Sequence, residues 1–137
     1  MPRGPVPLRF HALIEPVAGL LLIAAPWIFG FSDVDSATTL SVVAGIAVLL
    51  TGMSTRWRWS LVKLIPLRTH FMMDVGIGIL LVAAPWIFGF GDEGGAARFF
   101  VIAGILELAT ALMTRWDLRE ETAAGRRDTR ATTTSSR

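Results

Sequence analysis

Four long apolar runs limit what this chain of 137 residues can fold into. They cover roughly residues 12–31, 37–53, 71–90 and 96–113, and each has about the 17–25 residues that a helix needs to cross a bilayer. Residues of the AVILMFWYC set make up 53% of the chain, so too few polar residues remain to coat four helices in water. The sequence therefore predicts an all-α fold of four transmembrane helices.

The chain also contains an internal duplication. At an offset of 59 residues, residues 11–57 align with residues 70–116 without a gap, and 23 of the 47 aligned positions are identical. The longest identical segment is Ala-Ala-Pro-Trp-Ile-Phe-Gly-Phe, at 24–31 and again at 83–90. Each repeat holds two apolar runs, so both repeats enter the membrane in the same direction. We therefore expect two tandem two-helix repeats related by a pseudo-twofold axis along the membrane normal.

These patterns divide the chain into five parts. Residues 1–11 form an N-terminal segment, 12–57 and 70–116 are the two repeats, 58–69 form a linker, and 117–137 form a tail. The tail is rich in Thr, Arg, Ser and Glu and has almost no large apolar residue, so we expect it to be disordered.

The cations predict how the chain is oriented. Twelve of the thirteen Lys and Arg residues fall on the side of the N-terminal segment, the linker and the tail, and only Arg98 falls on the other side. Because Lys and Arg close to the spans remain cytoplasmic, we expect both termini and the linker in the cytoplasm. Tryptophans fall at both boundaries, where they are expected to act as interfacial anchors: Trp27 and Trp86 at the outer one, and Trp57, Trp59 and Trp116 at the inner one.

The doubled Pro-Trp-Ile-Phe-Gly-Phe, reached by a helix with a small residue before the proline, resembles the SPW repeat family of small bacterial integral membrane proteins. The resemblance covers about residues 9–116. The signature Ser-Pro-Trp is here Ala-Pro-Trp, at 25–27 and 84–86, so any role of that serine hydroxyl is absent. The resemblance implies a fold and a location in the bacterial plasma membrane, and it brings no established activity with it.

The repeated motif is expected to end a helix and turn the chain. Pro26 and Pro85 lack the amide that would bond to the carbonyl four residues earlier, and Gly30 and Gly89 suit a tight turn. A structural role is therefore favoured over a gating hinge. Small residues within the spans are expected to let helices approach closely, either within the chain or between copies: Gly19, Ser41, Gly45, Gly76, Gly78 and Gly104.

One carboxylate lies deep within a predicted span. Glu107 has Val48 as its counterpart in the first repeat. Because an acid at the bilayer centre costs a few kcal/mol, we expect Glu107 to be neutral or paired and to face protein or water. A hydrogen bond to a neighbouring helix is the favoured role, and proton or cation conduction is the alternative.

Two histidines precede acids by one helical turn, His11 with Glu15 and His70 with Asp74, at matching places in the repeats. We expect the two pairs to converge into a polar cluster on the cytoplasmic side, most simply as a structural hydrogen-bond network. Ion or proton handling is the next interpretation. A metal site of two histidines and two carboxylates is the weakest, because nothing else in the sequence offers an outer shell of ligand partners.

The chain lacks common catalytic and phosphate-binding motifs, among them Gly-x-Ser-x-Gly, the P-loop and His-Glu-x-x-His, and it has no cysteine. We therefore expect a non-enzymatic structural or interaction component of the plasma membrane, without a cofactor. Membrane lipids, further copies of the chain or other membrane proteins are the expected partners. The basic, aromatic linker indicates an interfacial anchor, and no nucleic acid partner is expected.

Two other functions stay open at this point. The alternative is a small channel or proton-linked transporter that uses Glu107 together with the two histidine–acid pairs. A metal-dependent membrane enzyme is the third interpretation.

Overall fold

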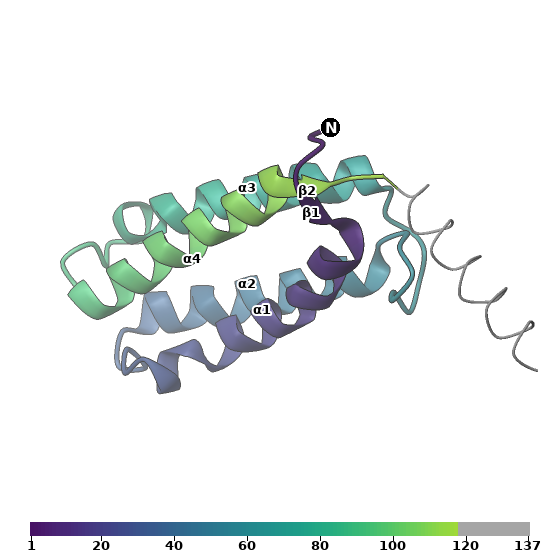
Figure 1. The fold of residues 1–137 in the computed structure, drawn as a ribbon. Helices are drawn as coiled ribbons and strands as arrows, with labels where there is room; N and C mark the ends of the chain where they lie inside the picture. The colour runs from purple at the N-terminus through teal and green to yellow at the C-terminus, as the bar shows by residue number, and fades with distance from the viewer. Residues whose placement is uncertain (118–137) are drawn as a thin grey trace, which may run out of the picture.

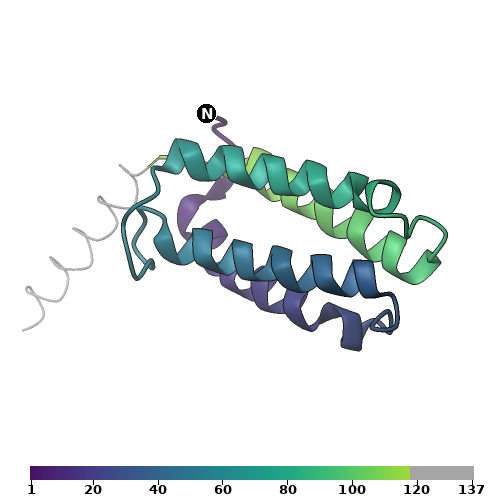
Figure 2. The same ribbon diagram turned by 180° about the vertical axis from the view of Figure 1, so that it is seen from behind.

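The computed structural model describes residues 1–117. Its four helices are α1 (Leu8–Ile28), α2 (Asp35–Ser54), α3 (Leu67–Ile87) and α4 (Gly94–Met113). They form two antiparallel hairpins, α1 with α2 and α3 with α4, which lie side by side (Figure 1), and Figure 2 shows α2 and α3 on the opposite face. Each helix is long and apolar enough to cross a membrane, which confirms the predicted all-α fold class. The pseudo-twofold axis stays a prediction, and the predicted tail lies outside the described residues apart from Asp117.

The outward faces of the helices are apolar. Large side chains on all four helices are more than half exposed, among them Leu20, Leu50, Ile79 and Ile102. Such a surface is unfavourable in water and suits the hydrocarbon of a bilayer. The chain is therefore a membrane protein with four helical spans.

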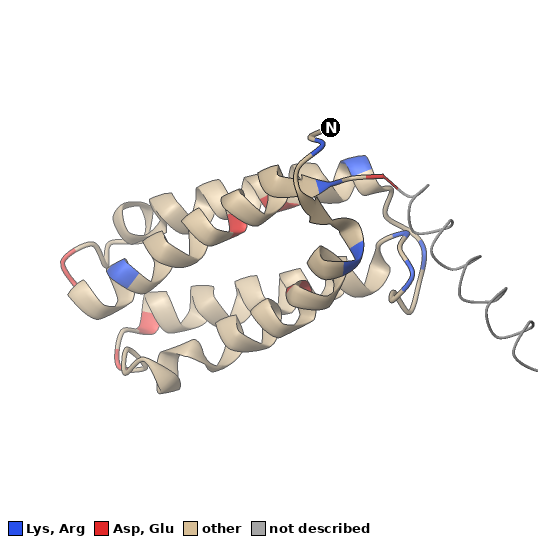
Figure 3. Cartoon of the chain, viewed as in Figure 1, with Lys and Arg blue, Asp and Glu red and all other residues tan. Residues whose placement is uncertain are grey.

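Charged residues gather at the two ends of the bundle, apart from acidic residues within the helices (Figure 3), which are Glu15, Asp74 and Glu107. We call the end that carries the N-terminus and residues 55–66 the linker end, and the end that carries residues 29–34 and 88–93 the loop end. Most Lys and Arg lie at the linker end, whereas the loop end carries acidic residues and one cation. The bundle is thus polarised along its long axis.

The repeated motif ends α1 and α3 in the same way. Gly30 adopts a φ of 71°, and the amide of Phe31 donates to the carbonyl oxygen of Pro26 at 2.9 Å. In α3, Gly89 has a φ of 73° and the matching hydrogen bond is 2.8 Å long. This is a Schellman motif, in which a left-handed glycine closes the helix. The predicted helix ends at residues 31 and 90 are three residues too late, because the glycine stops each helix first.

The first helix of each repeat begins four residues earlier than predicted, at Leu8 and Leu67 rather than at residues 12 and 71. The segment Pro-Leu-Arg occurs at 7–9 and again at 66–68, and a first helix starts directly after each proline. Strand β1 (Val6–Pro7) pairs in parallel with strand β2 (Thr114–Arg115), and a matching parallel bridge joins Thr55 to Ile65. The end of each repeat is therefore tied to the residues that precede the first helix of the other repeat.

Glycines bring the two helices of each repeat together. A Cβ atom on Gly45 would lie 2.5 Å from the carbonyl oxygen of Gly19, and one on Gly104 would lie 2.7 Å from that of Gly78. The predicted close approach is thus confirmed at these four positions. At Gly76 no other part of residues 1–117 lies within 4 Å of the position its Cβ would take, so close approach within the chain is absent there and contact with another copy stays a prediction.

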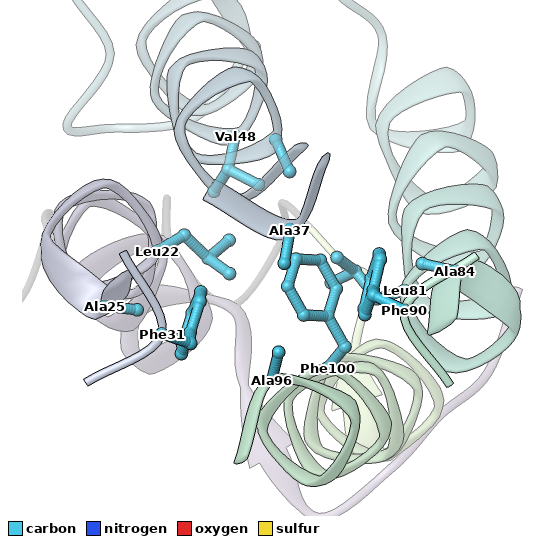
Figure 4. Close-up of a cluster of buried hydrophobic side chains, with 11 residues drawn as sticks. Leu22, Ala25, Phe31, Ala37, Val48, Leu81, Ala84, Phe90, Ala96 and Phe100 are labelled. Carbon is cyan, nitrogen blue, oxygen red and sulfur yellow. The ribbon is translucent and has the colours of Figure 1, made fainter. Parts of the chain in front are cut away.

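An apolar core fills the half of the bundle nearer the loop end, where side chains from all four helices meet (Figure 4). Phe31, Phe90 and Phe100 are its largest members, and Ala25, Ala37 and Ala84 let the helices close around them. The other half of the bundle, toward the linker end, contains buried polar side chains.

Candidate functional site: a buried histidine–acid quartet

Four titratable side chains meet inside the linker half of the bundle. His11 and Glu15 come from α1, and His70 and Asp74 come from α3. Their exposed fractions are 5%, 6%, 0% and 2%, so all four are buried. The structure therefore brings together the residues that the sequence marks as a candidate polar cluster. We call this cluster the quartet.

Each histidine of the quartet contacts the acid of the other repeat. His11 Nε2 lies 3.2 Å from Asp74 Oδ2, and His70 Nε2 lies 3.0 Å from Glu15 Oε2. Within the repeats, His11 Nε2 is 3.8 Å from Glu15 Oε2 and His70 Nε2 is 3.3 Å from Asp74 Oδ1. The pairs expected from the helical spacing are present, and the quartet also links α1 to α3.

Two threonines hold the second nitrogen of each histidine ring. The Thr55 hydroxyl lies 2.8 Å from His70 Nδ1, and the Thr114 hydroxyl lies 3.1 Å from His11 Nδ1. Each hydroxyl also donates its hydrogen to the backbone carbonyl four residues earlier, at 2.6 Å. Because a hydroxyl has one hydrogen to donate, its oxygen accepts from the Nδ1–H group. Both rings therefore carry hydrogen on Nδ1 and present Nε2 to the carboxyl groups.

Two tryptophans close the quartet toward the linker end. The Trp57 ring lies 4.6 Å from the ring of His70, and the Trp116 ring lies 4.9 Å from that of His11, measured between centroids. Both tryptophans are buried, so their predicted role as interfacial anchors is wrong. The bridges at residues 55 and 114 fold the chain back over the bundle and turn both rings inward. Trp59, by contrast, is exposed.

Sequence reasoning missed the part that the threonines and tryptophans play. The signal available was the segment Thr-Arg-Trp, which follows the second helix of each repeat at 55–57 and 114–116. Its duplication indicates a shared structural task. Only the docking of the repeats shows that this segment meets the histidine of the other repeat.

The polar atoms at the centre of the quartet have no well-directed hydrogen bond. Those left without a partner are His11 Nε2, His70 Nε2, Glu15 Oε2 and Asp74 Oδ2, although each faces an opposite group at 3.0–3.8 Å. Buried polar atoms of this kind are costly unless a proton or a cation lies between them. The quartet can therefore act as a proton-sharing network or as a cation site.

Glu107 lies outside the quartet. Its side chain lines a cavity of about 630 Å³ between α1 and α4, and it borders a second cavity of about 20 Å³ that reaches His11 and Glu15. The predicted interhelical hydrogen bond is wrong, since the Glu107 carboxyl group makes none within residues 1–117. In the larger cavity, the α1 residues beside Glu107 are apolar and offer no hydrogen-bonding side chain, for example Ile14 and Leu21.

Comparison with known proteins identifies the family. The family model of the SPW repeat domain matches residues 9–114. This chain belongs to the SPW repeat family. No curated protein and no solved structure matches it. The SPW repeat match includes the whole quartet and reaches Thr114, so these residues lie within the domain that defines the family.

Proposed function

We propose that this SPW repeat protein is a non-catalytic, multi-pass component of the bacterial plasma membrane, in which the quartet locks the two repeats together. The crossed pairing carries the proposal: each histidine lies against an acid, a threonine and a tryptophan of the other repeat. The quartet is also enclosed, with no member more than 6% exposed. An enclosed site suits internal support better than turnover of a substrate.

The proposed orientation places both termini and the linker end in the cytoplasm. It is supported by the gathering of Lys and Arg at that end (Figure 3). In this orientation the quartet lies near the cytoplasmic boundary. The exposed apolar faces would contact lipid, and further copies or other membrane proteins could cover part of them.

A channel or proton-linked transporter would need a wet path through the bilayer past Glu107. The cavity that borders Glu107, His11 and Glu15 has a volume of about 20 Å³, which is room for about one water molecule. The larger cavity is lined mainly by apolar side chains. Neither feature favours conduction, so transport is not the function we propose.

A double-mutant cycle tests the lock directly. His70→Ala, Glu15→Ala and the double variant are compared with the wild type by unfolding in detergent. Because these side chains belong to different repeats and lie in contact, we expect a coupling energy of about 1 kcal/mol or more. The pair Met72→Ala and Leu20→Ala, both exposed on the same two helices, serves as the matched control and should show additive effects.

A measurement of proton flux into liposomes distinguishes the proposed structural role from a proton-transport function. Wild-type protein in vesicles with an internal pH dye should give no flux above that of empty vesicles. A flux that Glu107→Gln abolishes while the fold stays intact would replace the structural role with transport.

A further inference from the structure

The quartet places two imidazole nitrogens beside the buried carboxyl groups of Glu15 and Asp74. We propose that it binds one divalent transition metal ion, and that this ion is zinc. This inference deepens the proposed function, on which it rests, because the ion would be what the two repeats close around.

The threonines leave the correct nitrogen of each histidine free for a metal. Thr55 and Thr114 accept the Nδ1–H groups of His70 and His11, so in the neutral form of each ring the lone pair is on Nε2. Histidines that bind metal commonly donate their second ring N–H to an oxygen acceptor, which fixes the ring and its tautomer. The sequence-based argument against a metal, that no outer partners exist, therefore fails, since the two threonines are those partners.

The spacing of the nitrogen and oxygen atoms is close to that of the ligands around a zinc ion. Zinc bonds to nitrogen and oxygen are about 2.0–2.1 Å long, so neighbouring ligand atoms in a tetrahedron lie about 3.3 Å apart. The nitrogen–oxygen separations in the quartet are 3.0, 3.2, 3.3 and 3.8 Å, with Asp74 presenting Oδ2 to His11 and Oδ1 to His70. His11, His70 and Asp74 each offer an atom within 4.8 Å of the other two. Glu15 lies outside this group of three: its Oε2 is 3.0 Å from His70 Nε2 and 3.8 Å from His11 Nε2, and it would have to shift toward Asp74 to become the fourth ligand.

The charge of the two carboxylates and the buried atoms without a hydrogen-bond partner are both consistent with a bound divalent ion. Two ionised carboxylates and one divalent cation sum to zero while both histidines remain neutral. The same ion would satisfy four buried atoms that otherwise have no hydrogen-bond partner: His11 Nε2, His70 Nε2, Glu15 Oε2 and Asp74 Oδ2. Nitrogen and oxygen ligands of this kind suit zinc and its first-row neighbours.

The surroundings of the quartet indicate a structural rather than a catalytic metal site. Trp57 and Trp116 cover the histidine rings, and every ligand is buried. Structural zinc sites are closed by four protein ligands, whereas catalytic sites keep one position open. An ion at this place would join α1 to α3, as the crossed contacts already do.

Metal content is the first test. The full chain, purified without a polyhistidine tag, is analysed for all transition metals by mass spectrometry. We expect about one ion per chain in the wild type and less than about a tenth of that in His70→Ala. Glu107→Gln is the matched control, because it removes a nearby acid outside the quartet, and it should keep the full content.

A second variant keeps all four ligands, so that loss of metal cannot be blamed on loss of the fold. Thr55→Val removes only the acceptor of the His70 Nδ1–H group and its hydroxyl bond to the preceding turn. In competition with a chelator, we expect its zinc affinity to fall about 10- to 100-fold. Thr38→Val, whose hydroxyl contacts loop carbonyls at the loop end, should leave the affinity unchanged.

Measurements on the wild type alone complete the test. Removal of the ion by a chelator should lower the melting temperature, and zinc chloride should restore it. X-ray absorption at the zinc edge should show nitrogen and oxygen neighbours at about 2.0 Å with the outer-shell pattern of imidazole. Less than a tenth of an equivalent of any transition metal, together with no rise in melting temperature on addition of zinc, would overturn the metal site.

The two proposals fail in distinguishable ways. If the protein holds no metal but the His70–Glu15 coupling energy persists, the proposed joining of the two repeats by the quartet is supported and the proposed metal site is overturned. If the protein binds zinc stoichiometrically but the His70–Glu15 coupling energy is absent, the ion is not held between these two residues, and both proposals are overturned.

Discussion

The hydroxyl group of Ser41 supplies a hydrogen-bond donor that the backbone of α1 lacks. Pro26 has no amide to offer the carbonyl of Leu22, and the Ser41 hydroxyl of α2 donates to that carbonyl at 2.6 Å. The matching position in the second repeat is Phe100, which has no hydroxyl and instead fills the apolar core. The two repeats therefore differ at this position. Ser41 satisfies a backbone carbonyl in the first repeat, whereas Phe100 fills the apolar core in the second.

Ser41→Ala should lower the free energy of unfolding by about 1 kcal/mol, because it leaves a buried carbonyl without a donor. The loss is measured by unfolding in detergent. Ser36→Ala is the control, since Ser36 is exposed on the same helix. Equal effects of the two variants would show that the Ser41 bond contributes nothing.

Glu107→Gln should change the free energy of unfolding by less than about 0.5 kcal/mol. The carboxyl group borders cavities and makes no hydrogen bond within the described residues, so an amide of the same shape loses no partner. Asp74→Asn, by contrast, alters a buried group in contact with both histidines and should cost about 2 kcal/mol. A loss for Glu107→Gln as large as that for Asp74→Asn would place Glu107 in the quartet network.

At the scale of helices, contact within each repeat depends on paired glycines. Gly19 faces Gly45, and Gly78 faces Gly104, so the backbones of α1 and α2, and of α3 and α4, approach without intervening side chains. Close backbone contact maximises dispersion attraction, which replaces the hydrophobic effect as the force between helices in lipid. The two hairpins are thus the rigid units that the quartet joins.

Gly45→Ala and Gly104→Ala should each destabilise the fold by about 1–3 kcal/mol, because the new methyl group would overlap a facing backbone. Gly76→Ala is the matched control in α3: it meets no atom, so it should be neutral or slightly stabilising through the helix preference of alanine. Melting temperatures in detergent measure the difference. Similar losses at all three positions would contradict glycine-mediated packing.

At the scale of the whole molecule, the gathering of Lys and Arg at the linker end supports the proposed orientation, which thiol labelling can test. The native chain has no cysteine, so single cysteines report position without background. Ser36→Cys and Gly95→Cys lie near the loop end and should react with an impermeant thiol reagent in intact cells. Leu61→Cys, at an 83% exposed linker position, should react only after the membrane is opened. Labelling of Leu61→Cys in intact cells would reverse the orientation.

Features that depend only on residues close together in the sequence could be predicted from it. The apolar runs define four spans because a backbone in hydrocarbon must satisfy its own hydrogen bonds. The repeated glycine ends α1 and α3 because it alone adopts a left-handed turn there without strain. The spacing of each histidine and its acid also follows from one helical turn.

What each of these side chains meets was decided by tertiary structure. Thr114 reaches His11 across 103 positions of sequence, and Trp116 turns inward where the sequence alone indicated a membrane interface. Glu107, expected to bond a neighbouring helix, instead faces cavities beside α1. Hydropathy and repeat spacing describe each hairpin alone, whereas the quartet exists only because the end of each hairpin docks against the first helix of the other.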